Sequence, residues 1–177
     1  MKKIIAITGP ECSGKTELCA YLHRITPHSA VVPEYSRTYL ESRPLEYPYQ
    51  LSDVVHIAHE QHRLIAEARA GSSHVIFCDS DYFVLLIWLK DVFGYSFPEL
   101  ETWILEASFD SILLCRPDLP WEPDPLRENP HDRDRLFDLY KAEIAARSLS
   151  YQIIEGLGEE REENAVQALS YLFSSNA

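Results

Sequence analysis

Residues 9–16 read G-P-E-C-S-G-K-T, which is a complete G-x-x-x-x-G-K-[ST] phosphate-binding loop. The apolar run 4–7 precedes this loop and predicts a buried strand, and residues 16–22 after it predict the first turns of a helix. A glycine loop between a strand and a helix points backbone N–H groups at phosphate oxygens, and the helix N terminus adds its positive dipole end. The pattern therefore predicts a site for a nucleoside triphosphate.

Two side chains of this loop have expected partners on ATP. Lys15 is placed to reach the β- and γ-phosphates, and the Thr16 hydroxyl is placed to ligate Mg²⁺. ATP and Mg²⁺ are thus the expected cofactors. The other phosphate-binding positions are Gly9, Glu11, Cys12, Ser13 and Gly14. Cys12 is either a redox-sensitive thiol or a loop position that tolerates small residues, and the second interpretation is favoured.

Composition limits the classes of protein and partner. The chain has 177 residues, of which 46% are apolar, enough for one folded core. Its net charge of −12 argues against a nucleic-acid-binding surface, which needs clustered Lys and Arg. No apolar run approaches the ~20 residues that span a bilayer, and residues 1–3 lead into the first strand without a signal peptide. Four cysteines without a C-x-x-C pair predict reduced thiols and a cytoplasmic protein.

Five short apolar segments alternate with helical or loop material. They are residues 3–8, 30–32, 74–78, 111–115 and 151–154. Such alternation predicts parallel strands with helical crossovers, hence an α/β fold: a three-layer α/β/α P-loop NTPase with a five-stranded parallel sheet. Helices are expected over 51–70, 82–93 and 160–173, the second of them apolar all round and so buried. Without an internal repeat or linker, residues 1–177 are interpreted as a single domain.

Residues 116–135 interrupt this alternation, because they hold five of the eleven prolines and ten charged residues. The segment follows a strand end, which is where ligands bind in open α/β sheets, and loops of this length are usually functional or disordered. Its arginines, Arg127 and Arg133 among them, are placed to close over a triphosphate. The alternative is a solvent-exposed loop of balanced charge. The favoured interpretation is an Arg/Pro-rich lid loop that becomes ordered when nucleotide binds.

Carboxylates at two strand ends are candidates for the chemistry. Glu34 lies in V-P-E-Y-S-R after the second strand, placed to take a proton from a substrate hydroxyl, with Arg37 available to hold substrate or phosphate. A plain surface Glu–Arg pair is the alternative. Asp79 ends an apolar strand as a Walker B carboxylate does, and a Mg²⁺ role is favoured over a helix N-cap. Asp81 is expected either to bind ribose hydroxyls or to cap the next helix.

Aromatic and histidine residues lie near these motifs. Aromatic residues of this kind are more often core or surface residues than platforms for stacking, but nearness to the motifs makes stacking on a substrate ring an expectation for Tyr35, Trp88 and Trp121, and less so for Tyr82. Three histidines in residues 56–62 recur every third position of the long helix. Steps of three drift around a helix by about 60° each, so a metal site is not expected there.

The motifs in this order resemble one family. They are residues 9–16, V-P-E-Y-x-R at 32–37, the Asp-x-Asp strand end at 79–81, and P-D-L-P-W-E at 117–122 with L-R-E at 126–128. The set is similar to the nicotinamide riboside kinase domain of the bifunctional bacterial NAD-regulatory and biosynthetic proteins, within the AAA-like P-loop kinases. Residues 151–161 look like the family's last strand and adenine-side turn, which implies a nucleotide contact for Arg161. The second and fourth motifs are far more specific than the phosphate loop.

The resemblance implies ATP-dependent phosphorylation of the 5′-hydroxyl of nicotinamide riboside to nicotinamide mononucleotide. It implies Mg²⁺ at Thr16 and Asp79 and charge neutralisation by Arg127 and Arg133. Either Glu34 or Asp79 is expected to take the hydroxyl proton, and Glu34 is favoured on its position. Two alternatives stay open: a kinase of another small nucleoside or nucleotide, and a regulatory P-loop ATPase without a small acceptor.

Three departures from the family's pattern qualify the resemblance. Cys12 stands where the family usually has Ser, and Asp124-Pro125 replaces a usual Asp-Gly, which predicts a stiffer lid turn. The chain shows no segment like the family's nucleotidyltransferase or DNA-binding domains, so regulation through DNA is not expected.

Overall fold

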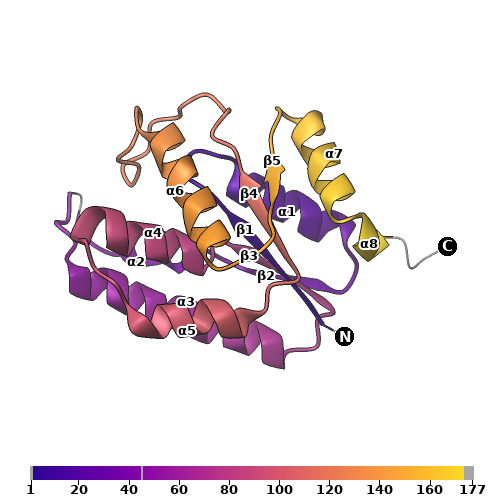
Figure 1. Ribbon diagram of the computed structural model, residues 1–177, viewed down its shortest axis with the longest axis horizontal. Helices are drawn as coiled ribbons and strands as arrows, with labels where there is room; N and C mark the ends of the chain where they lie inside the picture. Colours follow the sequence, from indigo (N-terminus) through magenta and orange to yellow (C-terminus); the bar gives the residue numbers. More distant parts are fainter. Residues whose placement is uncertain (1, 45, 174–177) are drawn as a thin grey trace.

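Five parallel strands form one sheet in the computed structural model, which describes residues 2–44 and 46–173 (Figure 1). The strands are β1 (Lys3–Thr8), β2 (Ser29–Val32), β3 (Val75–Asp79), β4 (Ser111–Cys115) and β5 (Gln152–Ile154). Their order across the sheet is β2-β3-β1-β4-β5. All five predicted strands are confirmed, with each boundary within one residue of its prediction.

Helices follow the strands along the chain. They are α1 (Lys15–Ile25), α2 (Tyr35–Glu41), α3 (Leu51–Ala70), α4 (Tyr82–Phe93), α5 (Pro98–Ala107), α6 (Arg133–Ala146), α7 (Glu159–Ala168) and α8 (Ser170–Phe173). The helices predicted over 51–70 and 82–93 are confirmed as α3 and α4. The helix predicted over 160–173 is divided at Leu169 into α7 and α8, and α2, α5 and α6 are absent from the predictions.

α6 begins inside the segment that the sequence predicts as a lid. The lid prediction extends to residue 135, whereas the helix starts at Arg133. Four of its residues recur at helical spacing and are buried: Leu136, Phe137, Tyr140 and Ile144. Because the charged residues at its start interrupt this pattern, the sequence does not predict this helix. The predicted lid is therefore a loop of residues 116–132, and this segment is called the lid.

Alternate residues of β1 face two different helical layers. Ile4 and Ala6 belong to the core shared with α3, α4, α5 and α6. Ile5 and Ile7 belong to the core shared with α1 and α7. Figure 1 shows α3, α4 and α5 on one side of the sheet and α1, α7 and α8 on the other. The predicted three-layer α/β/α fold is therefore confirmed, and a strand buried on both faces explains the continuous apolar run.

α4 is apolar over residues 82–89, before Lys90 and Asp91, because other helices pack against it. It packs against α3, α5 and α6, and Phe83, Leu86 and Leu89 are fully buried. With 12 residues it is shorter than the ~20 that span a bilayer. Across residues 2–44 and 46–173, no helix has the length and apolar character that membrane crossing requires.

Gly9 lets the chain leave β1 in close contact with β4. Its φ is +136°, a conformation that side chains with a Cβ rarely adopt, and a Cβ at this position would lie 2.6 Å from the Cys115 carbonyl oxygen. This contact is with backbone in the centre of the sheet, which cannot yield as a flexible side chain does. The start of the phosphate loop is thus fixed by glycine.

Gly9→Ala is expected to lower the free energy of unfolding by at least about 2 kcal/mol, because it combines backbone strain with a clash. Gly94→Ala is the matched control: Gly94 also has a positive φ, of +59°, but a Cβ there meets nothing within 4 Å. The control should cost only about 1 kcal/mol. Urea unfolding midpoints of the two variants measure the difference, and equal losses would contradict the close contact.

Candidate active site at the carboxyl edge of the sheet

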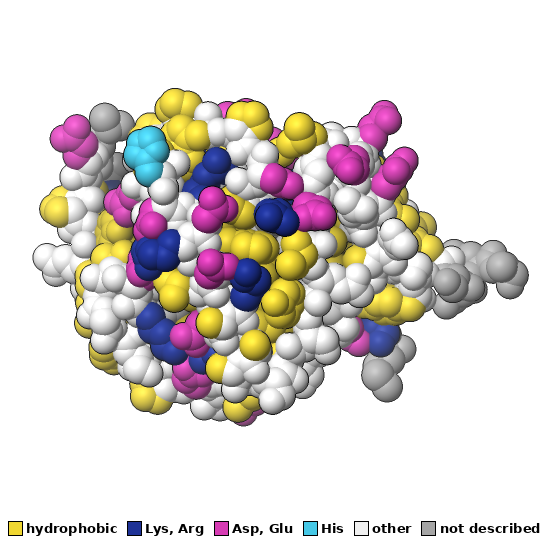
Figure 2. Space-filling view, turned by 45° about the horizontal axis from the view of Figure 1, so that its top comes forward, with side chains coloured by type: hydrophobic (Ala, Val, Ile, Leu, Met, Phe, Trp, Pro, Cys, Tyr) yellow, Lys and Arg dark blue, Asp and Glu magenta, His cyan; other side chains and the backbone are white. Residues whose placement is uncertain are grey.

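The carboxyl ends of the strands border a cavity of about 970 Å³. Its lining comes from the phosphate loop, α2, residues 43–44 and 46–49, α4, α6 and the lid. In Figure 2, which brings the top of Figure 1 forward, basic and acidic side chains lie close together around apolar surface. Because ligands bind at this edge in open parallel sheets, the cavity is the candidate active site.

The phosphate loop connects β1 to α1 as predicted. Gly14 occupies the N-cap of α1 with a φ of 73°. The Lys15 ammonium donates to the Gly9 carbonyl at 2.9 Å and to the Pro10 carbonyl at 2.8 Å, so it lies across the loop. A triphosphate would offer this ammonium charged oxygens, which are stronger acceptors than the carbonyls.

Asp79 lies at the end of β3, beside the phosphate loop. It pairs in register with Ile7 of β1 and is 5% exposed, and its Oδ1 atom has no hydrogen-bond partner. Burial raises the pKa of Asp79, while the Thr16 hydroxyl and the Lys15 ammonium act in the opposite direction. A buried carboxylate oxygen free to bind, next to a threonine hydroxyl, fits Mg²⁺, which in nucleotide sites takes few protein ligands besides phosphates and waters.

Asp81 caps α4 and does not line the cavity. Its Oδ1 accepts a hydrogen bond from the Phe83 N–H at 3.0 Å, and the residue is 0% exposed. Burial raises the pKa of this carboxyl to about 6, although the Thr8 hydroxyl and the N–H groups of α4 stabilise its charge. The structure supports the capping role, and the expected ribose contact is not supported because the carboxylate is buried away from the cavity.

Glu34 enters the cavity from the N-cap position of α2. Its Oε1 accepts a hydrogen bond from the Ser36 hydroxyl, and its Oε2 accepts one from the Ser80 hydroxyl at 3.1 Å. Behind it, the buried Gln61 side chain accepts from the Tyr35 N–H at 2.9 Å, which fixes the turn before α2. The carboxylate is therefore held in place at the wall of the cavity.

Trp88 and Tyr49 form an aromatic wall of the cavity. Their ring centres lie 5.0 Å apart at an angle of 76°, an edge-to-face contact. Tyr35 and Trp121 do not line the cavity, so the stacking expected of them is not supported. Tyr49 was missed because the Y-P-Y sequence at 47–49 lies outside every recognised motif, and only the fold brings it to Trp88.

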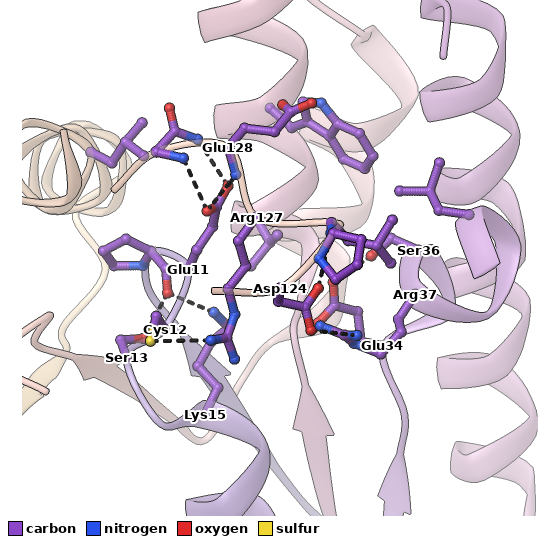
Figure 3. Close-up of a pocket in the computed structure, with 18 of the residues that line it drawn as sticks. Glu11, Cys12, Ser13, Lys15, Glu34, Ser36, Arg37, Asp124, Arg127 and Glu128 are labelled. Atoms are coloured by element: carbon purple, nitrogen blue, oxygen red, sulfur yellow. Dashed lines mark hydrogen bonds and ion pairs between the residues drawn. The ribbon is translucent and has the colours of Figure 1, made fainter. Parts of the chain in front are cut away.

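The lid loop lies against both the phosphate loop and α2. The Arg127 guanidinium donates to the Glu122 carbonyl at 2.5 Å and to Cys12 Sγ at 3.3 Å, and Figure 3 shows it pointing toward the phosphate loop. Arg37 pairs with Asp124 of the lid at 3.2 Å. Both arginines line the cavity, so the lid and α2 each bring a cation to it.

Arg133 fastens the start of α6 to the phosphate loop and does not line the cavity. Its Nη1 donates to the carbonyls of Cys12 and Leu119, both at 3.0 Å. Its guanidinium also lies 5.6 Å from the centre of the Trp121 ring. The expected contact of Arg133 with a transferred phosphoryl group is not supported, because the side chain is committed to backbone and aromatic partners.

Arg161 is buried behind the phosphate loop, with 5% of its surface exposed. Its guanidinium donates to the carbonyls of Ser13, Arg116, Ile154 and Gly156 and to the Asp118 carboxylate. The direct nucleotide contact implied for Arg161 is not supported, since its N–H groups are already bound. Arg161 instead ties the phosphate loop to the ends of β4 and β5.

Arg161→Lys is expected to lower the free energy of unfolding by about 2–3 kcal/mol, because lysine keeps the charge but cannot satisfy all of these acceptors. Arg63→Lys is the control: Arg63 pairs on the surface of α3 with Glu60 and Glu67, and it should change stability little. Thermal unfolding compares the two variants. A Tm for Arg161→Lys equal to that of Arg63→Lys would contradict the structural role.

Neither the cysteines nor the histidines form a metal site. All four cysteines are free, and burial raises the pKa of Cys19, Cys78 and Cys115, which makes these thiols unreactive. His62 stacks on Trp103, with ring centres 4.1 Å apart. In the part of the chain that the structure describes, no group of three or more His, Cys, Asp or Glu residues is arranged to hold a metal.

The strand order, the phosphate loop and the carboxylate at the end of β3 define a P-loop nucleotide-binding protein. The chain belongs to the family AAA_28, described as an AAA domain, which matches residues 4–161.

Curated relatives come from NAD metabolism. The chain is 31% identical over 135 residues to the trifunctional NAD biosynthesis/regulator protein NadR of Escherichia coli (strain K12). The protein of the same name from Salmonella typhimurium (strain LT2) matches with the same identity over the same length. Each match covers 75% of this chain and 33% of the relative, so the chain spans about a third of the length of these relatives.

Solved structures of NadR share the fold. One is a NadR protein in complex with NR, with a TM-score of 0.81 and 18% identity, and the other is a NadR protein in complex with NAD and AMP-PNP, with a TM-score of 0.80 and 19% identity. Both matches cover 99% of this chain, and 52% and 51% of the respective NadR chains. The family resemblance drawn from the motifs is therefore confirmed.

Proposed function

We propose that this protein transfers the γ-phosphoryl group of ATP to the 5′-hydroxyl of nicotinamide riboside and forms nicotinamide mononucleotide. The observation that carries the proposal is a shared cavity, which Lys15 and Thr16 line in one part and Glu34, Trp88 and Tyr49 line in another. The NadR relatives, with structures that contain NR and AMP-PNP, support this choice of acceptor and donor.

The residues of the phosphate loop hold the donor. Lys15 and the loop N–H groups bind the β- and γ-phosphates, and Arg127 of the lid meets the charge that develops on the transferred group. Thr16 and Asp79 would hold Mg²⁺, which would offset the charge of the phosphates. The unpartnered Oδ1 of Asp79 is the observation that favours this metal position.

Glu34 accepts the proton of the attacking hydroxyl. It lines the cavity, whereas Asp79 does not, and two serine hydroxyls hold its carboxylate. A carboxylate held in this way needs no rearrangement when the hydroxyl arrives. The wall of Trp88 and Tyr49 offers an aromatic surface for the nicotinamide ring, which is flat and cationic.

The test is phosphoryl transfer from Mg·ATP to a panel of nucleosides, measured as ADP released and as phosphorylated product. Nicotinamide riboside should react fastest, and little ADP should form without a nucleoside. Lys15→Ala should lower kcat by about 10²-fold or more, because it removes a cation that stabilises the transition state. Lys141→Ala, in which the lost lysine pairs with Asp138 outside the cavity, is the control and should turn over normally.

Each contrary result of this panel has a distinct meaning. Preference for another nucleoside would replace the acceptor and keep the kinase. Rapid ADP release without any acceptor would indicate a regulatory ATPase. Full turnover by Lys15→Ala, with the Tm of the unmodified chain, would refute phosphoryl transfer at this loop.

Glu34→Gln should lower kcat by roughly 10²–10⁴-fold and leave ATP binding nearly unchanged, because the carboxylate acts on the acceptor hydroxyl. Asp79→Asn should instead shift the Mg²⁺ dependence of turnover, because its carboxylate is assigned to the metal. Steady-state kinetics over a range of Mg²⁺ concentrations separate the two. If Asp79→Asn shows only a kcat defect while Glu34→Gln raises only the KM of the nucleoside, the assignment of the base is reversed.

A further inference from the structure

Glu11 is an acidic residue inside a phosphate-binding loop, and its carboxylate binds the lid. Oε2 accepts hydrogen bonds from the backbone N–H of Glu128 at 2.9 Å and of Asn129 at 3.2 Å. Oε1 accepts one from Asn129 Nδ2 at 2.9 Å (Figure 3). A carboxylate repels phosphate oxygens but is a strong acceptor for N–H groups. The phosphate contact expected of Glu11 is therefore not supported, and its partner is the lid.

Glu128 is also held by Tyr49, which belongs to the aromatic wall of the cavity. The Tyr49 hydroxyl donates to Glu128 Oε2 at 2.8 Å. Burial raises the pKa of Tyr49 to about 12, and the Glu128 hydrogen bond adds to this shift, so the phenol keeps its proton and remains a donor. Glu128 is thus fastened through its backbone to the phosphate loop and through its side chain to the aromatic wall.

Arg127 stands directly before this fastened residue. Its own N–H donates to the Asp124 carbonyl at 3.0 Å, which closes a turn of the lid. With the backbone fixed on both sides of Arg127, the guanidinium has a defined place in the cavity, where it contacts Cys12 of the phosphate loop. Movement of residues 128 and 129 would carry Arg127 with them.

We propose that Glu11 is a positioning residue, which docks residues 128 and 129 of the lid onto the phosphate loop and thereby places Arg127 at the transferred phosphoryl group. This inference rests on the proposed kinase function for its catalytic consequence. The docking itself requires only the contacts between Glu11 and the lid. Glu11 acts through Arg127 and makes no contact with the phosphates.

Backbone hydrogen exchange tests the docking without any turnover. The backbone N–H groups of Glu128 and Asn129 donate to Glu11. In the Glu11→Gln variant, hydrogen exchange at both N–H groups should be faster, with and without a non-hydrolysable ATP analogue, because the neutral Gln side chain is a weaker acceptor. Asn129→Ala removes only the hydrogen bond from Asn129 Nδ2 and keeps the backbone donors, so it should speed exchange less. Glu67→Gln is the matched control, since Glu67 is an exposed carboxylate of α3 far from the lid in sequence and outside the cavity. Unchanged exchange in Glu11→Gln, at an unchanged Tm, overturns the docking.

A double-mutant cycle tests the action through Arg127. Glu11→Gln should lower kcat about tenfold when Arg127 is present, and less than twofold in the Arg127→Ala background, because the positioned group is then gone. Glu67→Gln should leave kcat unchanged in both backgrounds. Equal effects of Glu11→Gln in the two backgrounds overturn the positioning role. If the unmodified chain phosphorylates no nucleoside, the proposed function fails, and the exchange experiment still decides whether Glu11 docks the lid.

Discussion

The backbone hydrogen bonds of β1 with its two neighbouring strands determine which groups can meet in the cavity. β1 pairs in parallel with β3 on one side and with β4 on the other. Because parallel strands end at the same edge, the phosphate loop after β1, Asp79 at the end of β3 and the lid after β4 begin side by side. The contact of Gly9 with the Cys115 carbonyl closes this arrangement at the centre of the sheet. The buried Arg161 adds a second tie, from Ser13 to the ends of β4 and β5.

Sequence reasoning succeeds here where a local pattern has one physical meaning. Continuous apolar runs locate the strands, since a strand covered on both faces has no polar side. The phosphate loop and Glu34 are recognisable because a strand end fixes where the next few residues lie. The Arg161 environment has no such local signal: its acceptors include four carbonyls from three segments, which only the fold assembles. Tyr49 contacts Trp88 in the same way, although the two residues are 39 positions apart in the sequence.

Residues next to a motif are the ones that sequence reasoning places least well. Asp81 is two positions from Asp79, yet it points into the cap of α4 and is 0% exposed. Tyr35 follows Glu34, but a helix start sends neighbouring side chains in different directions, and Tyr35 packs on Tyr39 with ring centres 6.3 Å apart. Nearness in sequence therefore identifies the right loop or helix end without identifying which side chain enters the cavity.

For the proposed phosphoryl transfer, water must be kept away from the donor until the acceptor is bound, and the lid contacts offer a way to link the two events. The lid meets the phosphate loop through Glu11, α2 through the Asp124–Arg37 pair, and the aromatic wall through Tyr49. Under the proposed function, an acceptor that packs on Tyr49 and Trp88 would support the same lid that borders the phosphate loop, so its binding energy would go into closure over the reacting groups. The net charge of −12 means that the chain has no general excess of cations, so those proposed to meet the phosphates are placed individually by the loop, the lid and α2.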